Sequence, residues 1–232
     1  MPLGNPRGAG RKALISQESI VEASMRLLER DGLEALTIRN VAAELGVKSA
    51  SLYWHFTSKE ALIDRLADEV LEGLPQVPAA PTWRETLRLR ALALFRHLAS
   101  RRDAARLRAG RLVTGPNTLR WMEVGLSVFR GAGFSPEAAA FASHALHVYA
   151  VGSAIFATTP LSALEAEGGA ASEALAAARH TFESLPANTF PNIVALSAPL
   201  TEGGPEARFL YGLDALIDGI ARSSLGKREA SA

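Results

Sequence analysis

Apolar residues recur at spacings of three and four along most of this chain, while the alternation of apolar and polar residues that marks a strand is scarce. The first such stripe lies between Ser16, which can cap a helix at its start, and Gly32, which favours a helix end. Its members are Ile20, Ala23, Leu27 and Leu28. This spacing places apolar side chains on one face of a helix, and its repetition predicts an all-α fold.

Capping residues and prolines divide the remaining chain into further predicted helices. Thr37 opens a short helix that stops at Gly46, a second short helix covers about 49–56, and a longer one follows over about 58–74. A proline-rich break then leads to helices over about 83–98, 103–110, 116–131, 136–158, 172–185 and 205–222. Prolines and paired glycines predict a long loop over 186–204.

The composition limits the kinds of site that the chain can hold. Its 232 residues are 48% hydrophobic, which is enough for one large domain or two small ones. The net charge of +1 provides no general attraction for nucleic acid or membrane, so any site for a polyanion must be local. Cysteine is absent, which excludes disulfides, thiolate nucleophiles, iron–sulfur clusters and the common structural zinc sites.

Two stretches bear on localisation. The N-terminus lacks the apolar core of a secretory signal. The longest nearly uncharged stretch, 134–160, contains Glu137, His144 and His147, and it has too few consecutive apolar residues for a membrane span. We therefore expect a soluble, cytoplasmic protein without a membrane partner.

The segment from Leu36 to Lys59 carries the most specific pattern. Two predicted short helices are joined there by Leu45-Gly46-Val47-Lys48, in which Gly46 supplies the backbone freedom for a sharp turn. The apolar residues placed to face inward are Val41, Ala42, Leu45, Leu52 and Phe56. This is the sequence form of a helix-turn-helix, whose second helix enters the major groove of DNA.

The polar residues around this turn suit a DNA surface. The small residues that begin the second helix are Ser49, Ala50 and Ser51. Their size allows the backbone to approach base edges closely. Tyr53, His55 and Lys59 offer hydrogen-bond donors to phosphates, and the helix starts at Thr37 and Ser49 add backbone N–H groups aimed at anions.

The run from Thr37 to Phe56, followed by Ser58-Lys59-Glu60-Ala61-Leu62-Ile63, resembles the DNA-binding domain of the tetracycline-repressor (TetR) family. Its most specific part is Leu52-Tyr53-Trp54-His55 with Lys59 four residues further on. Segments 102–110 and 133–152 resemble the C-terminal domain of the tetracycline repressors themselves. The resemblance covers about residues 14–158 and, less specifically, the final helix.

The resemblance implies an N-terminal three-helix helix-turn-helix domain, which a connecting helix joins to a C-terminal helical domain for ligand binding and dimerisation. The implied bounds are 1–13 for a basic, flexible arm, 14–60 for the DNA-binding domain, 61–75 for the connecting helix, 81–222 for the C-terminal domain and 223–232 for a flexible tail. The implied function is that of a homodimeric repressor, bound to a palindromic operator and released by a small hydrophobic or aromatic effector.

The resemblance also assigns roles at the DNA. Arg39 would reach a base, and Ser49, Ala50 and Ser51 would line the tip that contacts bases. Phosphates would be held by Thr37, Tyr53, His55 and Lys59, with Trp54 and Lys48 beside them. The tetracycline repressors have Gln, Pro and Thr where this chain has Ser49, Ala50 and Ser51, which implies a different operator sequence.

A two-fold operator needs two recognition helices about 34–36 Å apart, so a chain with one such helix needs a second copy. The helices over 136–158 and 205–222 are expected to form the dimer seam. The terminal helix would bury Phe209, Leu213, Leu216 and Ile220 there. Its Gly212 and Gly219 would allow close approach of the two helices.

The implied ligand pocket lies in the C-terminal domain. Five residues match positions that contact drug in the tetracycline repressors: Arg90, Leu94, Arg108, Gly125 and Val148. Further polar-tipped or aromatic candidates nearby are Phe95, His97, Trp121, His144 and His147. His144 and His147 have the spacing of a zinc pair, but no third ligand stands out, so we expect no metal and no cofactor.

One departure from the tetracycline repressors bears on the effector. Val148 and Phe156 stand where those proteins hold magnesium with a histidine and a glutamate, and Arg108 and Arg111 replace a drug-contacting histidine and a threonine. We therefore predict no binding of magnesium–tetracycline. The implied pocket is apolar and partly aromatic, with Arg90 and Arg108 available to an anionic or phenolic group.

Two alternatives remain at this point. The chain could be a DNA-binding regulator without a small-molecule effector, such as an activator or a regulator controlled by a partner protein. An all-helical enzyme is the other, but the chain has no GlyXSerXGly elbow, P-loop, Rossmann glycine pattern or HisGluXXHis motif. We therefore expect a non-enzyme.

Overall fold

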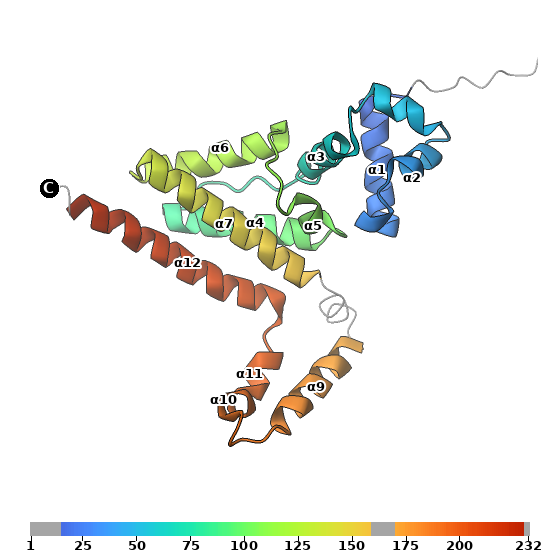
Figure 1. The fold of residues 1–232 in the computed structure, drawn as a ribbon. Helices are drawn as coiled ribbons and strands as arrows, with labels where there is room; N and C mark the ends of the chain where they lie inside the picture. Colours follow the sequence, from blue (N-terminus) through green and yellow to red (C-terminus); the bar gives the residue numbers. More distant parts are fainter. Residues whose placement is uncertain (1–14, 159–169, 230–232) are drawn as a thin grey trace, which may run out of the picture. The chain divides into compact units, whose positions relative to one another are not determined.

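The computed structural model describes residues 15–158 and 170–229 (Figure 1). These residues form helices joined by turns and loops, and no strand occurs among them, which confirms the all-α prediction. Contacts divide the chain into two compact units, whose boundary lies between Leu62 and Ile63. The predicted arm over 1–13 lies outside the described residues.

The first unit is built on α2 (Ile38–Glu44), which packs against α1 (Gln17–Asp31) and the 3₁₀ helix η2 (Ser49–Trp54). A second 3₁₀ helix, η1 (Leu33–Ala35), follows α1 directly. The largest fully buried side chains in this unit are Ile20, Leu28, Leu36, Leu52, Leu62 and Val41. The two ends of the predicted helix-turn-helix are thus held by one small apolar core.

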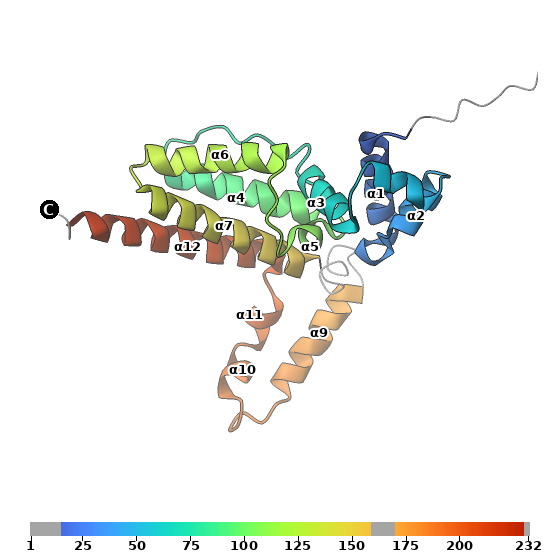
Figure 2. The ribbon, with the colours of Figure 1, turned by 45° about the horizontal axis from the view of Figure 1, so that its top comes forward.

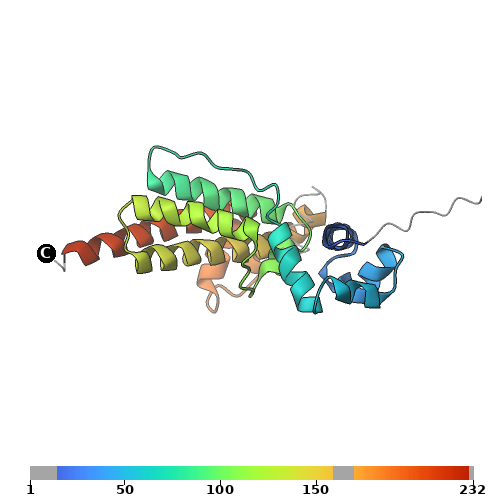
Figure 3. The same ribbon diagram turned by 90° about the horizontal axis from the view of Figure 1, so that it is seen from above.

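The second unit contains four long helices: α4 (Trp83–Ala99), α6 (Pro116–Gly131), α7 (Pro136–Ala157) and α12 (Gly204–Glu229). α7 packs against α4, α6 and α12 and also against the short α5 (Ala104–Arg108). Figures 2 and 3 show these helices side by side. The boundary between the units falls inside α3 (Lys59–Glu69).

Aromatic side chains fill two parts of this core. The rings of Trp83 and Phe134 meet edge to face with centroids 5.2 Å apart, and Phe129 completes that cluster. Phe95 of α4 stacks on Phe209 of α12 with centroids 4.3 Å apart, and Tyr149 of α7 also stacks on Phe209, with centroids 5.3 Å apart. These contacts fix α12 against α4 and α7.

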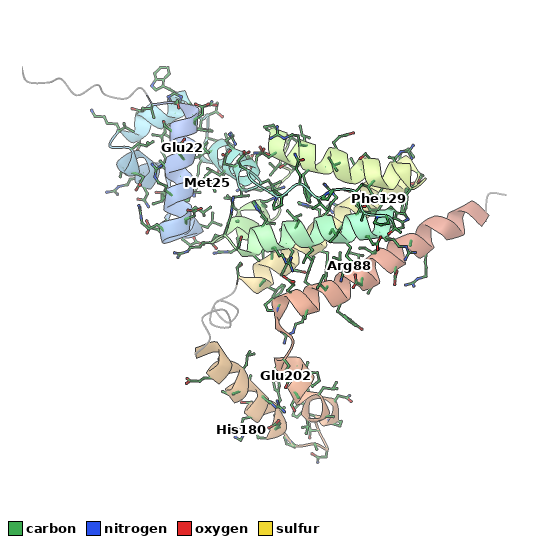
Figure 4. All side chains as sticks on the ribbon, turned by 180° about the vertical axis from the view of Figure 1, so that it is seen from behind. Glu22, Met25, Arg88, Phe129, His180 and Glu202 are labelled. Atoms are coloured by element: carbon green, nitrogen blue, oxygen red, sulfur yellow. The ribbon has the colours of Figure 1, made fainter. Side chains whose placement is uncertain are left out.

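Ion pairs run along the outside of the α4–α12 contact. Arg84 pairs with Asp218 at 2.6 Å, and Arg88 pairs with Asp214 at 2.6 Å. Figure 4 labels Arg88 where α4 and α12 lie side by side. Arg96 pairs with Glu206 further along. Because these groups are partly exposed, each ion pair contributes little to the stability of the fold. Together the pairs favour the antiparallel register of α4 and α12.

A smaller group of helices precedes α12. α9 (Ala170–Glu183), α10 (Pro191–Ala195) and α11 (Ser197–Thr201) pack on one another. The prediction of a loop over 186–204 is therefore wrong. Pro191 occupies the first turn of α10, where a proline favours a helix start because its missing N–H would have no partner there.

Two predicted helix ends also differ. α12 continues to Glu229, beyond the predicted end near residue 222, so part of the expected tail is helical. α3 ends at Glu69 rather than near Leu74, and tighter i to i+3 hydrogen bonds carry the chain to Gly73, whose φ is +72°. The left-handed backbone at that glycine ends the helical run.

Part of the stripe assigned to a dimer seam on the terminal helix is buried within the chain itself. Phe209 and Leu213 are buried against their own chain, while Leu216 and Ile220 are only partly buried. A Cβ at Gly212 would lie 2.1 Å from the Tyr149 hydroxyl of the same chain, whereas nothing lies within 4 Å of one at Gly219. The close approach at Gly212 is therefore an intrachain contact.

Candidate DNA surface and ligand cavity

The turn between α2 and η2 has the hydrogen bonds that its sequence predicts. Gly46 adopts a φ of +66°, its N–H donates to the Ala43 carbonyl at 3.0 Å, and the Val47 N–H donates to the Ala42 carbonyl at 2.9 Å. This pair of bonds is a Schellman motif, which satisfies the last carbonyls of a helix. Lys48 then leads into η2 in an extended conformation.

The start of η2 lies on the surface. Leu52 and Phe56 are buried, so the intervening Tyr53 and Trp54 turn outward, with 55% and 90% of their surfaces exposed. Arg39, Lys48, Ala50 and Lys59 are also exposed. The remaining predicted DNA contacts are partly buried, and they are Thr37, Ser49, Ser51 and His55. None of these side chains belongs to the core of the unit.

The cations of this surface are available to a polyanion. Within the described residues, Arg39, Lys48 and Lys59 form no ion pair. The carboxylate of Glu44, the one acid between Arg39 and Lys59 on α2 and η2, accepts from Arg30 at 3.0 Å and lies 3.8 Å from Arg26. Both arginines belong to α1, so Glu44 is neutralised from within the unit.

The second unit contains a cavity of about 590 Å³. Its wall is formed by α4, α6 and α7 together with the segment 108–113. Of the predicted ligand contacts, those that line it are Arg90, Leu94, Arg108, Trp121, Gly125, His144, His147 and Val148. Most of the remaining wall is aliphatic, and the volume suits an organic molecule of drug size.

His97 lies outside this cavity and has a different role. Its Nε2 is 2.8 Å from the Val70 carbonyl, which also accepts from Arg101 at 3.3 Å. Burial lowers the pKa of His97, which keeps the imidazole neutral. Both side chains hydrogen-bond to the Val70 carbonyl just beyond the end of α3, where the helix itself supplies no N–H partner.

Arg90 is held flat against an aromatic ring at the cavity wall. Its guanidinium carbon lies 3.8 Å from the centroid of Trp121, and its Nη2 donates to the Trp121 carbonyl at 2.6 Å. Burial lowers the pKa of Arg90 to about 10, so the side chain remains charged at neutral pH. This arrangement presents a fixed cation to the cavity.

Arg108 connects the cavity to α3. Its Nη1 donates to the Ala67 carbonyl of α3 and to the Thr118 hydroxyl of α6, the second at 3.3 Å. Burial lowers the pKa of Arg108 to about 10, against the opposing effect of the nearby Asp68 carboxylate. Its buried Nε has no hydrogen-bond partner within the described residues. A cavity residue thus contacts the backbone of α3 directly.

Asp68 is a structural residue that the sequence interpretation missed. Its carboxylate accepts from the backbone N–H groups of Thr118 at 2.8 Å and Asn117 at 3.2 Å, so α3 caps the start of α6. α6 begins with Gly115 and Pro116, which offer no side-chain cap of their own. That lack was the signal that an acceptor had to come from elsewhere in the fold.

Burial sets the protonation of His147. Burial lowers its pKa to about 4, and the charges of Arg108 and His144 act in the same direction. An unfolded chain binds this proton near pH 6.5 and the folded chain only near pH 4, so stability falls as the pH drops through that window.

We expect that this histidine alone removes about 2 kcal/mol of stability between pH 7 and pH 5. His147→Gln should lose correspondingly less stability over the same interval. Urea unfolding followed by circular dichroism at the two pH values measures the difference. Equal losses in the two proteins would show that His147 is not held neutral.

Comparisons with known proteins agree with both units. Residues 20–66 match the family described as bacterial regulatory proteins, tetR family, and residues 74–223 match the tetracyclin repressor-like C-terminal domain. The tetracycline repressor protein class G of Vibrio anguillarum is 32% identical over 213 residues, covering 90% of this chain and 94% of that protein. The class C repressor of Escherichia coli is 32% identical over 217 residues, covering 91% and 93%.

Solved structures show the same fold. Apo ActR from Streptomyces coelicolor superposes with a TM-score of 0.80 at 29% identity, covering 93% of this chain and 99% of that one. The TetR family protein ActR in complex with actinorhodin gives 0.80 at 30% identity, covering 91% and 98%. The fold of this chain is therefore similar to that of ActR in its apo form and in its complex with actinorhodin.

Proposed function

This chain belongs to the TetR family of bacterial regulatory proteins, and on that premise we propose that it is a dimeric transcriptional repressor whose operator complex is released by a small, largely apolar molecule. The family is one of DNA-binding regulators, which agrees with the expectation that the chain is not an enzyme. The observation that carries the proposal is the exposed surface around the start of η2, where Arg39, Lys48 and Lys59 form no ion pair within the described residues and Glu44 is neutralised by arginines of α1.

At the operator, the tip of η2 would enter the major groove. Ser49, Ala50 and Ser51 are small enough for the backbone to approach base edges, and Arg39 is exposed on α2 to reach a base. The phosphates on either side would be contacted by Thr37, Tyr53, His55 and Lys59, with Lys48 and Trp54 adjoining.

A second copy of the chain would supply the other half of a two-fold operator. By length and composition alone, α7 could cross a membrane, since its mean hydropathy is 1.3. Only 33% of that stretch is buried within the chain, so apolar side chains of α7 remain exposed. Its exposed apolar side chains Phe141, Val148 and Phe156 lie near one stripe of the helix. Because the family is one of cytoplasmic DNA-binding proteins, we assign this stripe to the dimer seam rather than to a lipid contact.

Release would require an effector that prefers the form of the dimer that does not bind DNA. A tenfold effect on operator affinity needs about 1.4 kcal/mol of differential binding. Two contacts within the second unit suit this coupling, since Arg108 of the cavity wall donates to Ala67 and α6 is capped by Asp68. Both acceptors lie on α3, the helix that begins at the proposed phosphate contact Lys59.

The test begins with selection of a duplex from a random-sequence library by the purified full-length protein. We expect a palindromic site bound by two chains, with log affinity falling by about 0.9 per unit of log salt for each neutralised phosphate. Compounds that raise the melting temperature of the protein are then tested for release of that duplex.

The outcomes separate the alternatives. Failure to select any sequence-specific site would contradict the proposal. A specific site that no stabilising compound releases would favour a regulator without a small-molecule effector. Magnesium–tetracycline serves as a reference compound in this screen, and we expect it not to bind, because the positions of its histidine and glutamate ligands are Val148 and Phe156 here.

A further inference from the structure

The wall of the cavity carries positive charge without acid. Its arginines are Arg90, Arg108 and Arg111, and none of the lining residues that the structure describes is an Asp or a Glu. Arg111 pairs with Asp64 at 2.7 Å, so the positive charge of Arg111 is neutralised by that carboxylate. Neither Arg90 nor Arg108 forms an ion pair within the described residues. Two buried cations therefore face a mainly aliphatic space.

The hydrogen bonds of Arg108 within the described residues leave one edge of its guanidinium buried and without a hydrogen-bond partner. Nη1 is engaged with Ala67 and Thr118, whereas Nε is buried and has no partner within the described residues. Nε and the adjacent Nη2 form the side of the group to which a carboxylate binds with two parallel hydrogen bonds. An unpartnered buried N–H carries a free-energy penalty that such a ligand would remove.

The nearest acid does not fill this role. The two carboxylate oxygens of Asp68 accept from the backbone of Asn117 and Thr118, so they hold the start of α6. Their charge offsets that of Arg108 only from a distance. Arg90, fixed against Trp121, adds a second cation that has no carboxylate bound to it.

We propose that the effector is an organic acid with a large apolar body, whose carboxylate binds the Nε edge of Arg108 while the body fills the aliphatic part of the cavity. Arg90 contributes to the field that attracts the anion. His147, kept neutral by burial, adds a polar contact without adding charge. This inference rests on the proposed function, because it names the class of molecule that would release the operator.

The test uses two probes of the same size and shape, anthracene-2-carboxylate and the neutral anthracene-2-carboxamide. Their affinities for the full-length protein are measured at pH 7.5 by fluorescence titration and calorimetry. We expect the acid to bind at least tenfold more tightly than the amide. Equal binding of the two probes, or no binding of the acid at about 1 mM, would overturn the inference.

The variant Arg108→Gln should reduce the preference for the acid to less than threefold while the affinity for the amide stays unchanged. Arg101→Gln is the matched control, because Arg101 also donates to a backbone carbonyl, that of Val70 just beyond the end of α3, but does not line the cavity. It should keep the full preference. If Arg108→Gln does not fold, Arg90→Gln takes its place and should lower the preference at least threefold; an undiminished preference in the folded variant overturns the assignment.

Operator binding by the same wild-type preparation distinguishes this inference from the proposed function. Equal binding of acid and amide by a protein that binds its selected duplex overturns the inference alone. Absence of a specific duplex overturns the proposed function, whatever the probes do. Release of the duplex by the acid but not by the amide supports both.

Discussion

Replacing Asp68 with alanine is expected to lower the free energy of unfolding of the second unit by about 2–4 kcal/mol, because two N–H groups at the start of α6 lose their acceptor and the helix loses an anion at its N-terminus. Asp68 is 1% exposed, so water has little access to replace the lost carboxylate. The nearby charge of Arg108 also loses its opposing carboxylate. Urea unfolding monitored by circular dichroism measures the change.

Gly115→Ala tests the same contact without removing the carboxylate. A Cβ at this position would lie 2.2 Å from the Asp68 Cγ, so the acid must move away from α6. The expected loss is of similar size, about 2–3 kcal/mol. Gly131→Ala is the control at the other end of the same helix, where an added Cβ would meet nothing within 4 Å. If the two glycine variants were equally stable, Asp68 would not be the cap of α6.

Local signals in the sequence predict the helix starts well. The predicted cap at Ser16 is present, and the turn at Gly46 has its left-handed backbone. The helix predicted to begin near residue 83 does begin there, behind a capping box of Thr82 and Glu85. These features depend on residues three or four apart, so one stretch of sequence contains all the information. The exposure of Tyr53 and Trp54 follows from the burial of Leu52 and Phe56 in the same way.

Features that depend on distant residues could not be predicted. Asp68 caps a helix that begins 48 residues later, and His97 hydrogen-bonds to the Val70 carbonyl, 27 residues earlier in the chain. Nothing in the local pattern distinguishes that histidine from the ones that line the cavity. The helices within 186–204 were missed for another reason, since Pro191 is compatible with both a loop and a first helical turn.

A negative charge at the tip of η2 is expected to abolish operator binding. Ala50 is exposed at the start of this helix, between Ser49 and Ser51, where the proposed complex brings the backbone against DNA. Ala50→Glu adds a longer, anionic side chain among phosphates and base edges, and we expect at least about a 100-fold loss of affinity. Because the site is on the surface, the melting temperature should stay unchanged.

Two variants control for size and for charge. Ala50→Ser keeps a small neutral side chain at the tip, and it should stay within a few-fold of the wild-type affinity. Asn188→Glu adds the same charge at an exposed position between α9 and α10, and it should also bind the duplex normally. The comparison separates loss of the tip contact from a general change in net charge.

The most direct measurement is therefore the equilibrium affinity of Ala50→Glu for the selected duplex, determined by fluorescence anisotropy beside the wild type and Ala50→Ser at one salt concentration. We predict a loss of at least about 100-fold in a protein that remains folded and dimeric. Wild-type affinity in that variant would contradict the placement of η2 in the DNA groove.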